Sequence, residues 1–144
     1  MKPTLNEQGY VTGGMGGAID APEAATDLTV FRYRRVDGAW ADAFPGETDE
    51  NFMMSYNTLN ESWALAERKA LSIEPIKMEA ARRIEVLAWK IERATEVDAV
   101  DGTNTLASVY AERAAIRTAS NAHEDALNAL TTLAEMDEFN PAGF

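Results

Sequence analysis

Two amphipathic segments, IEPIKMEAARRIEVLAWKIERATEV (residues 73–97) and LASVYAERAAIRTASNAHEDALNALTTLA (residues 106–134), decide the fold. In both, apolar side chains recur at steps of three and four residues, which is the period of an amphipathic α-helix. The stripe of the first comprises Ile73, Ile76, Ala80, Ile84, Leu87, Ile91 and Ala94, and that of the second comprises Leu106, Val109, Ile116, Leu127, Leu130 and Ala134. Because only a short Asp-Gly break separates the segments, they predict an antiparallel helical hairpin with a partly coiled-coil seam.

The second segment has an interrupted seam. Arg113 and His123 lie among its leucine, valine and isoleucine positions. Polar side chains at such positions lower the stability of a coiled coil. We therefore expect a compact bundle rather than a long uniform coiled coil. Thr103 or Asn104, both good N-cap residues, marks the start of this helix.

An aromatic stripe predicts another helix before the hairpin, at about residues 49–70. Its members step by four, three, four, three and four, and are Phe52, Tyr56, Leu59, Trp63, Ala66 and Ala70. We expect its aromatic members, Phe52, Tyr56 and Trp63, to lie in the core, unless the subunits of an oligomer share them. Glu74-Pro75 then predicts the start of the next helix, because proline is tolerated in a first helical turn.

The clearest strand signal lies at residues 28–46. Two runs rich in β-forming residues flank Asp37-Gly38. An Asp-Gly pair between such runs specifies a two-residue type I′ turn and with it the register of a β-hairpin. The predicted pairs are Val36 with Ala39, Arg35 with Trp40, and Phe31 with Phe44.

The first 27 residues have neither a helical nor a strand period. Their centre, Gly13-Gly14-Met15-Gly16-Gly17, has a composition that packs poorly by itself. A terminal segment of this kind is ordered only where something ties it down, so we expect an extended arm that lies on another surface, such as a neighbouring subunit. The predicted organisation is an arm (1–27), a β-hairpin (28–46), a helical domain (47–139) and a tail (140–144).

The expected fold class is therefore mainly α. It consists of a long antiparallel helical hairpin plus a third helix, with a small N-terminal β-hairpin and an extended Gly-rich arm.

Composition argues against several classes of function. The 144 residues include 13 basic and 24 acidic side chains, for a net charge of −11, so the chain repels polyanions and nucleic-acid binding is disfavoured. Cysteine is absent, which excludes disulfides and thiolate chemistry. No apolar run approaches the roughly 18 residues that span a bilayer, so we expect neither a secretion signal nor a membrane partner.

Three motifs that could mark a chemical site are weak. Gly14-Met15-Gly16 lacks the third glycine of a dinucleotide-binding fingerprint. Asp98, Asp101 and Asn104 do not have the spacing of a calcium loop and fit a capped interhelical turn better. His123 is the only histidine and has no cysteine with which to form a zinc site. We therefore expect no cofactor, no metal site and no enzymatic activity.

Two helices carry more apolar or small-residue surface than one seam requires. Met78, Val86 and Trp89 lie away from the seam of the first segment, so that helix is apolar on two sides. It is also locally positive between Lys77 and Arg93. The second segment has a row of alanines, which lets another backbone approach closely. The candidate partner-binding residues are Met78, Val86, Trp89, Ala115, Ala119, Ala122, Ala126, Gly13, Gly14, Met15, Gly16 and Gly17.

Four stretches carry a family resemblance that spans about residues 28–139. They are Val-Asp-Gly-Ala-Trp (36–40), Ala-Arg-Arg-Ile-Glu (81–85), Tyr-Ala-Glu-Arg-Ala-Ala-Ile-Arg-Thr-Ala-Ser-Asn-Ala (110–122) and Ala-Glu-Met-Asp-Glu-Phe (134–139). In layout and wording the chain resembles the small tail-fibre assembly and tail-associated accessory proteins of tailed bacteriophages. The resemblance carries over no catalytic residue.

The resemblance and the two-sided helix together imply a non-enzymatic structural protein of a phage tail. We expect it to hold tail-fibre or baseplate proteins together as a homo- or hetero-oligomer, in the virion tail after assembly in the host cytoplasm. One alternative is a tail-fibre assembly chaperone that is absent from the mature virion. Another is an enzyme or regulator with an unrecognised carboxylate site, which a metal-dependent thermal melt would reveal.

Overall fold

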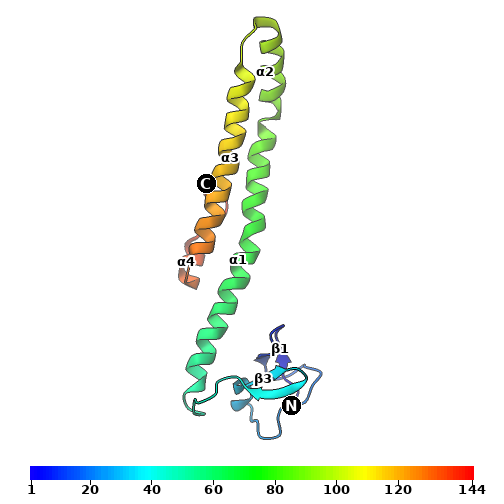
Figure 1. Cartoon of the computed structure of the whole chain (residues 1–144), viewed down its shortest axis with the longest axis vertical. Coiled ribbons are helices and arrows are strands. Elements are labelled where there is room, and N and C mark those ends of the chain that lie inside the picture. Colours follow the sequence, from blue (N-terminus) through cyan, green and yellow to red (C-terminus); the bar gives the residue numbers. More distant parts are fainter. The chain divides into compact units, whose positions relative to one another are not determined.

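The computed structural model describes residues 1–144 and divides them into two compact units, Met1–Ser62 and Trp63–Phe144. The fold is mainly helical, as predicted, with two small N-terminal β-hairpins (Figure 1). The elements in order are β1 (Thr4–Leu5), β2 (Val11–Gly13), the 3-10 helix η1 (Thr29–Arg32), β3 (Tyr33–Val36), β4 (Ala39–Asp42), α1 (Phe52–Val86), α2 (Ala88–Asp101), α3 (Thr105–Ala129) and α4 (Leu133–Glu138). Helix α1 contributes residues to both units.

The β3–β4 hairpin has the predicted register. Arg35 pairs with Trp40 and Val36 with Ala39. Asp37 and Gly38 have φ values of 49° and 79°, and two positive values in succession are the mark of a type I′ turn. The Arg35 guanidinium lies 5.4 Å from the centre of the Trp40 ring, so a cation–π pair forms across the strands.

The predicted pairing of Phe31 with Phe44 is wrong. Residues 29–32 form η1 instead of extending β3, so Phe31 is outside the sheet. Its ring lies 5.1 Å from the ring of Tyr56 on α1, and Phe44 lies 6.2 Å from that of Phe52. Both aromatic side chains therefore leave the hairpin and pack on the first turns of α1, where Phe52 and Tyr56 are buried as predicted.

The arm also differs from the prediction, because β1 and β2 pair within residues 1–27. The turn between them is closed by Asn6, whose side-chain oxygen accepts from the backbone N–H groups of Gln8 and Tyr10 at 3.0 Å. Val11 is fully buried, and the Tyr56 hydroxyl donates to its carbonyl at 2.7 Å. Strands of two and three residues are too short to produce a visible period. The arm is thus tied down by its own chain.

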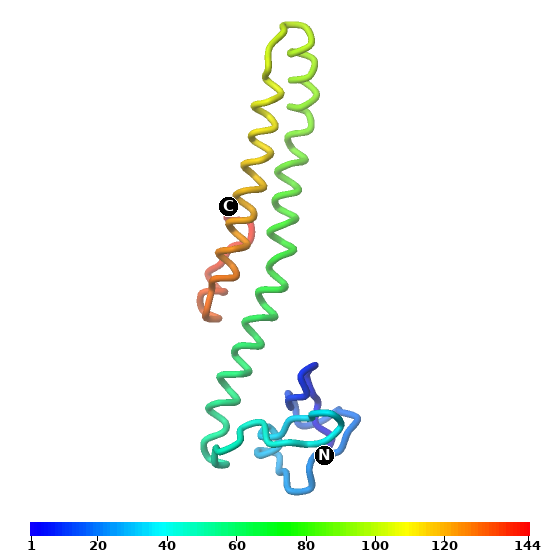
Figure 2. The backbone as a smooth tube through the Cα atoms, viewed as in Figure 1, coloured from blue at the N-terminus to red at the C-terminus, as the bar shows by residue number.

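In the second unit, α1 and α2 form one long bent helix, and α3 returns antiparallel to it (Figure 2). Only Leu87 separates α1 from α2, and its backbone stays in the right-handed helical region. The seam holds two apolar clusters. One is centred on Ile76, Leu127 and Met136, and the other on Leu87, Ala94 and Val109. Each cluster joins residues from both predicted stripes, so the predicted hairpin is confirmed.

The predicted helix break before Pro75 is wrong. Helix α1 continues through Pro75 to Val86. A proline inside a helix loses one backbone hydrogen bond and costs about 3 kcal/mol. The seam residues on both sides, Ile73 and the fully buried Ile76, belong to one apolar cluster. Packing of that cluster outweighs the local preference of proline for a helix start.

The turn between α2 and α3 lies where predicted, at Asp101-Gly102, and Gly102 adopts the left-handed conformation that ends a helix (φ 65°). Asn104 occupies the N-cap position of α3, as predicted, but the capping hydrogen bonds come from another residue. Neither Thr103 nor Asn104 caps α3 with its side chain. Asp98, near the end of α2, accepts from the backbone N–H groups of Thr105 and Leu106, both at 2.8 Å. One carboxylate thereby joins the two helices.

Candidate functional site

Helices α1 and α2 present a row of exposed apolar side chains away from the seam. We call it the outer stripe. Its members and their exposed fractions are Leu71 (69%), Met78 (64%), Val86 (53%), Trp89 (55%) and Val100 (84%). At 100° per residue they fall on one side of the helix, nearly opposite Ala80, Leu87 and Ala94. The predicted candidates Met78, Val86 and Trp89 therefore share one surface, and the structure adds Leu71 and Val100 to it.

A groove of about 380 Å³ borders the outer stripe at Trp89. Its apolar lining comes from Ala94, Val97 and Val109. Charged side chains line it as well, and among them Lys90 on α2 and Glu112 on α3 form an ion pair of 2.9 Å. Protein–protein contact surfaces usually combine apolar and charged side chains in this way.

The alanine row of α3 lies in the same unit as the outer stripe. Ala115, Ala122 and Ala126 are exposed, and Ala119 is half-buried. These side chains are outside both seam clusters. Helix α3 thus has a face of small residues besides its seam side, as the spacing of the alanines predicted.

The candidate glycines lie in the first unit, and Gly17 serves its internal packing. The Gly17 N–H donates to the Lys2 carbonyl at 2.8 Å, and a Cβ at Gly17 would lie 1.8 Å from the carbonyl oxygen of Pro3. Gly17 is therefore required where the loop crosses the first residues. Met15, the only large apolar side chain among residues 13–17, is 84% exposed. The structure does not bring these residues and the outer stripe into one unit.

Residues 139–144 fold back on the hairpin and are held by two side chains, Arg83 of α1 and His123 of α3. We call this arrangement the tail clamp. Arg83 donates to the Ala142 carbonyl at 3.0 Å and to the backbone oxygen of Phe144, and its guanidinium lies 4.3 Å from the centre of the Phe144 ring. The Phe139 and Phe144 rings also pack against the cluster around Ile76. The tail thus closes one end of the core.

His123 has a structural role in the tail clamp. Its ring stacks on Phe139 at 4.5 Å, and its Nε2 lies 2.7 Å from the Asn140 carbonyl oxygen. Since a carbonyl only accepts, this nitrogen carries the proton. The side chain that interrupts the predicted seam is therefore used to bind the tail.

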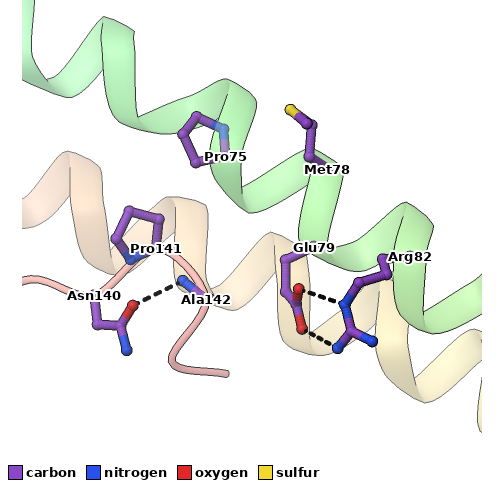
Figure 3. A pocket seen from close by; sticks show the side chains of 7 residues that line it. All are labelled: Pro75, Met78, Glu79, Arg82, Asn140, Pro141 and Ala142. Atoms are coloured by element: carbon purple, nitrogen blue, oxygen red, sulfur yellow. Dashed lines mark hydrogen bonds and ion pairs between the residues drawn. The ribbon is translucent and has the colours of Figure 1, made fainter.

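The tail clamp borders an open groove of about 650 Å³. Pro75, Met78 and Arg82 of α1 line one side, and Asn140 and Pro141 line the other (Figure 3). Arg82 is fixed on this wall by two hydrogen bonds to Glu79, at 2.9 and 2.7 Å. The bonds from Arg82 and Arg83 lower the pKa of the Glu79 carboxyl to about 2. Met78 belongs to both this groove and the outer stripe.

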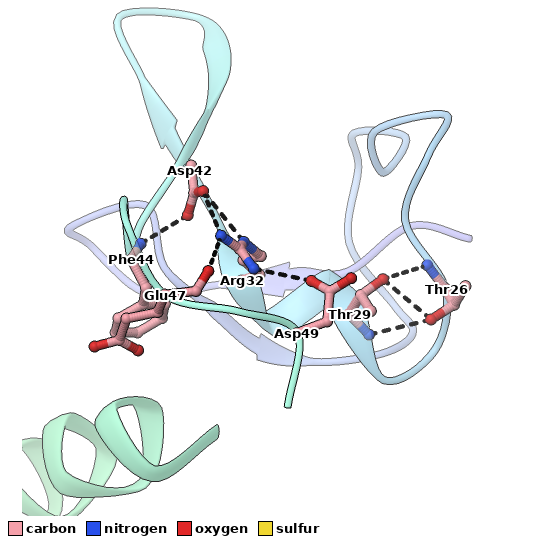
Figure 4. Close-up of polar contacts among 7 residues, drawn as sticks. All are labelled: Thr26, Thr29, Arg32, Asp42, Phe44, Glu47 and Asp49. Atoms are coloured by element: carbon pink, nitrogen blue, oxygen red, sulfur yellow. Dashed lines mark hydrogen bonds and ion pairs between the residues drawn. The ribbon is translucent and has the colours of Figure 1, made fainter. Parts of the chain in front are cut away.

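Arg32 organises the polar contacts of the first unit (Figure 4). It forms ion pairs of 2.9 Å with Asp42 and with Asp49, and donates to the Glu47 carbonyl. The hydrogen bond from Arg32 lowers the pKa of Asp42 and raises that of the guanidinium itself. The two arginines that follow in the chain also have internal partners, since Arg34 lies over the Tyr10 ring and Arg35 over the Trp40 ring.

Titratable side chains do not converge into a metal-binding group, because no three His, Asp or Glu residues lie close enough together to hold an ion. None of the helices combines the length and the apolar character needed to cross a membrane.

No protein-family model, no curated protein and no solved structure matches this chain. The candidate site therefore depends on the geometry of the outer stripe.

Sequence reasoning missed three parts of this surface, each for an identifiable reason. Val100 fell in the predicted turn, and Leu71 fell in the predicted break before Pro75. The tail clamp joins Arg83 to residues 59 and 61 positions further along, and no local pattern predicts a contact of that range. A spacing of eleven residues relates Met78, Trp89 and Val100. This spacing was the signal that could have added Val100 to the predicted surface.

Proposed function

We propose that the chain is a non-enzymatic assembly protein of a bacteriophage tail, a structural component that holds tail-fibre or baseplate proteins together. The observation that carries the proposal is the outer stripe. Five large apolar side chains are exposed along one side of a helix whose other side is already buried. Exposed apolar rows of this length on a folded chain are typical of protein–protein contact surfaces. The sequence resemblance supports the tail as the setting.

The first test is the substitution Trp89→Asp. A charge in the middle of the outer stripe disfavours burial against a partner, while the half-exposed position tolerates it in the isolated chain. We expect co-purification with tail components to be lost while the circular dichroism spectrum and melting temperature stay close to those of the wild type. Tyr110→Asp, at a comparably exposed aromatic residue of α3, is the matched control and should retain co-purification. Equal loss of folding and binding in Trp89→Asp would contradict the proposal.

The second test is mass spectrometry of purified virions. A structural component is present in finished particles at a fixed ratio to other tail proteins. A tail-fibre chaperone is present in infected cells and missing from the particles, so that result would replace the structural role with the alternative.

A further inference from the structure

The outer stripe has a symmetric pattern of charges about Trp89. Met78 and Val100 each lie eleven residues from Trp89 along the helix, one on either side. Arg82 and Glu96 each lie seven residues away. Glu85 and Arg93 each lie four residues away, so the pattern consists of one apolar pair and two pairs of opposite charge.

These seven side chains share one side of the long bent helix. An eleven-residue spacing corresponds to 3.67 residues per turn, which keeps a stripe nearly straight along an α-helix. All seven are exposed: Met78, Arg82, Glu85, Trp89, Arg93, Glu96 and Val100. The interruption of the helix at Leu87 therefore leaves the pattern on one accessible surface.

Three of the four charges of the pattern form no ion pair within the chain, and the fourth, Arg82, is paired with Glu79. Arg82 bonds Glu79 through Nε and Nη2, which leaves Nη1 without a partner. Among the ion pairs of the structure none includes Glu85, Arg93 or Glu96. The surface thus offers two cations and two anions around a central tryptophan.

We infer that this surface binds a second copy of the same chain, antiparallel, with the two Trp89 side chains at the two-fold axis. Rotation about that axis brings Arg82 opposite Glu96 of the other copy and Glu85 opposite Arg93. Met78 then meets Val100. A parallel pair in register would instead place each of the four charges opposite its own kind, and like charges in contact disfavour association.

The size of the surface sets the expected strength. Residues 78–100 extend over about 33 Å of helix at 1.5 Å per residue. One helix of that length lies at the small end of specific interfaces, with few anchor residues beyond the tryptophans. We therefore expect a reversible dimer whose population rises with protein concentration and falls with added salt.

The decisive experiment is a charge exchange read by sedimentation equilibrium of the full-length chain. Arg82→Glu creates two like-charge contacts per dimer and should weaken association by roughly tenfold or more. Arg82→Glu combined with Glu96→Arg restores opposite charges across the interface and should recover association to near the wild-type value. Arg117→Glu, the same charge change at an exposed residue of α3, should have little effect.

Cysteine cross-linking tests the direction, because the natural chain has no cysteine. A mixture of Met78→Cys and Val100→Cys proteins should form a disulfide between the two variants, and neither variant alone should cross-link efficiently. Self-cross-linking of Val100→Cys would establish a parallel pair and overturn the antiparallel dimer. A wild-type chain that stays monomeric at all concentrations would overturn it as well, and so would a double variant that associates as weakly as Arg82→Glu.

The inference uses the surface named in the proposed function, but its test needs only the purified chain. If the purified chain dimerises but purified virions lack it, the structural role fails and the dimer stands. If virions contain the chain but the purified chain is monomeric, the dimer fails and the structural role stands.

Discussion

Asp98 is the side chain that connects the end of α2 to the start of α3. Its carboxylate accepts from the Thr105 and Thr103 hydroxyls at 2.6 and 2.7 Å, in addition to two backbone N–H groups. These bonds, led by that of the Thr105 hydroxyl, hold the pKa of Asp98 well below its ordinary value of 3.8. The folded state therefore prefers the ionised carboxylate.

Asp98→Asn should lower the melting temperature at neutral pH, because the amide lacks the negative charge that favours a helix N-terminus and replaces one of the two accepting oxygens by a donor. The lowered pKa makes the stabilisation fully present above about 3.8, and it is lost as the pH falls below that value toward the folded-state pKa. The difference between wild type and variant should thus shrink in acid. Thermal melts at several pH values check this, and a pH-independent difference would show that the carboxylate charge is not involved.

Tyr56 is the second single side chain with a large effect, because its hydroxyl satisfies a buried carbonyl of β2. Tyr56→Phe leaves the Val11 carbonyl without that donor and should cost about 1–2 kcal/mol in the free energy of unfolding. Urea denaturation measures the loss, and hydrogen exchange should show faster opening of the β1–β2 amides. Tyr110→Phe, at an exposed phenol, is the control and should change little.

The long helix contains one local defect, Pro75. Proline has no N–H for the carbonyl four residues earlier, yet α1 continues through it. Pro75→Ala should restore that hydrogen bond and raise the free energy of unfolding by about 1–3 kcal/mol. Chemical denaturation checks the gain. Destabilisation would instead mean that the proline ring is needed for packing in the groove that it lines together with Asn140 and Pro141.

Elements with a strong local rule were predictable from the sequence. Asp37-Gly38 fixed the register of β3–β4 because the turn type alone specifies it. The seam followed from the spacing of apolar residues in α1, α2 and α3. The same spacing placed Met78 and Trp89 on the outer side of their helix, so part of the candidate site was predictable too.

Elements that depend on distant contacts were not predictable. The short strands β1 and β2 are held by Tyr56, which is 45 residues from its acceptor Val11. Phe31 leaves the hairpin because Tyr56 offers an aromatic contact that outweighs one further strand pair. The tail clamp depends on Arg83 in the same way. In each case tertiary packing overrides a local preference.

The two compact units should respond separately to substitution. Tyr56 and its acceptor belong to residues 1–62, and Asp98 with its donors belongs to residues 63–144. Residues with no shared partners have nearly additive effects. A chain with both Tyr56→Phe and Asp98→Asn should therefore show faster amide exchange in both units, each to the extent seen in the single variant. Exchange that spreads from one substituted unit to the other would mean that the chain unfolds as a single cooperative body.

The bond between Tyr56 and Val11 also has a consequence for synthesis on the ribosome. Because the N-terminus emerges first, β2 has no buried position until the first turns of α1 have left the exit tunnel. Helices α1 and α2 then emerge with both their seam and their outer stripe uncovered, since α3 follows them. The nascent chain thus passes through a stage with two apolar faces in water, and at that stage misassociation competes most strongly with closure of the hairpin.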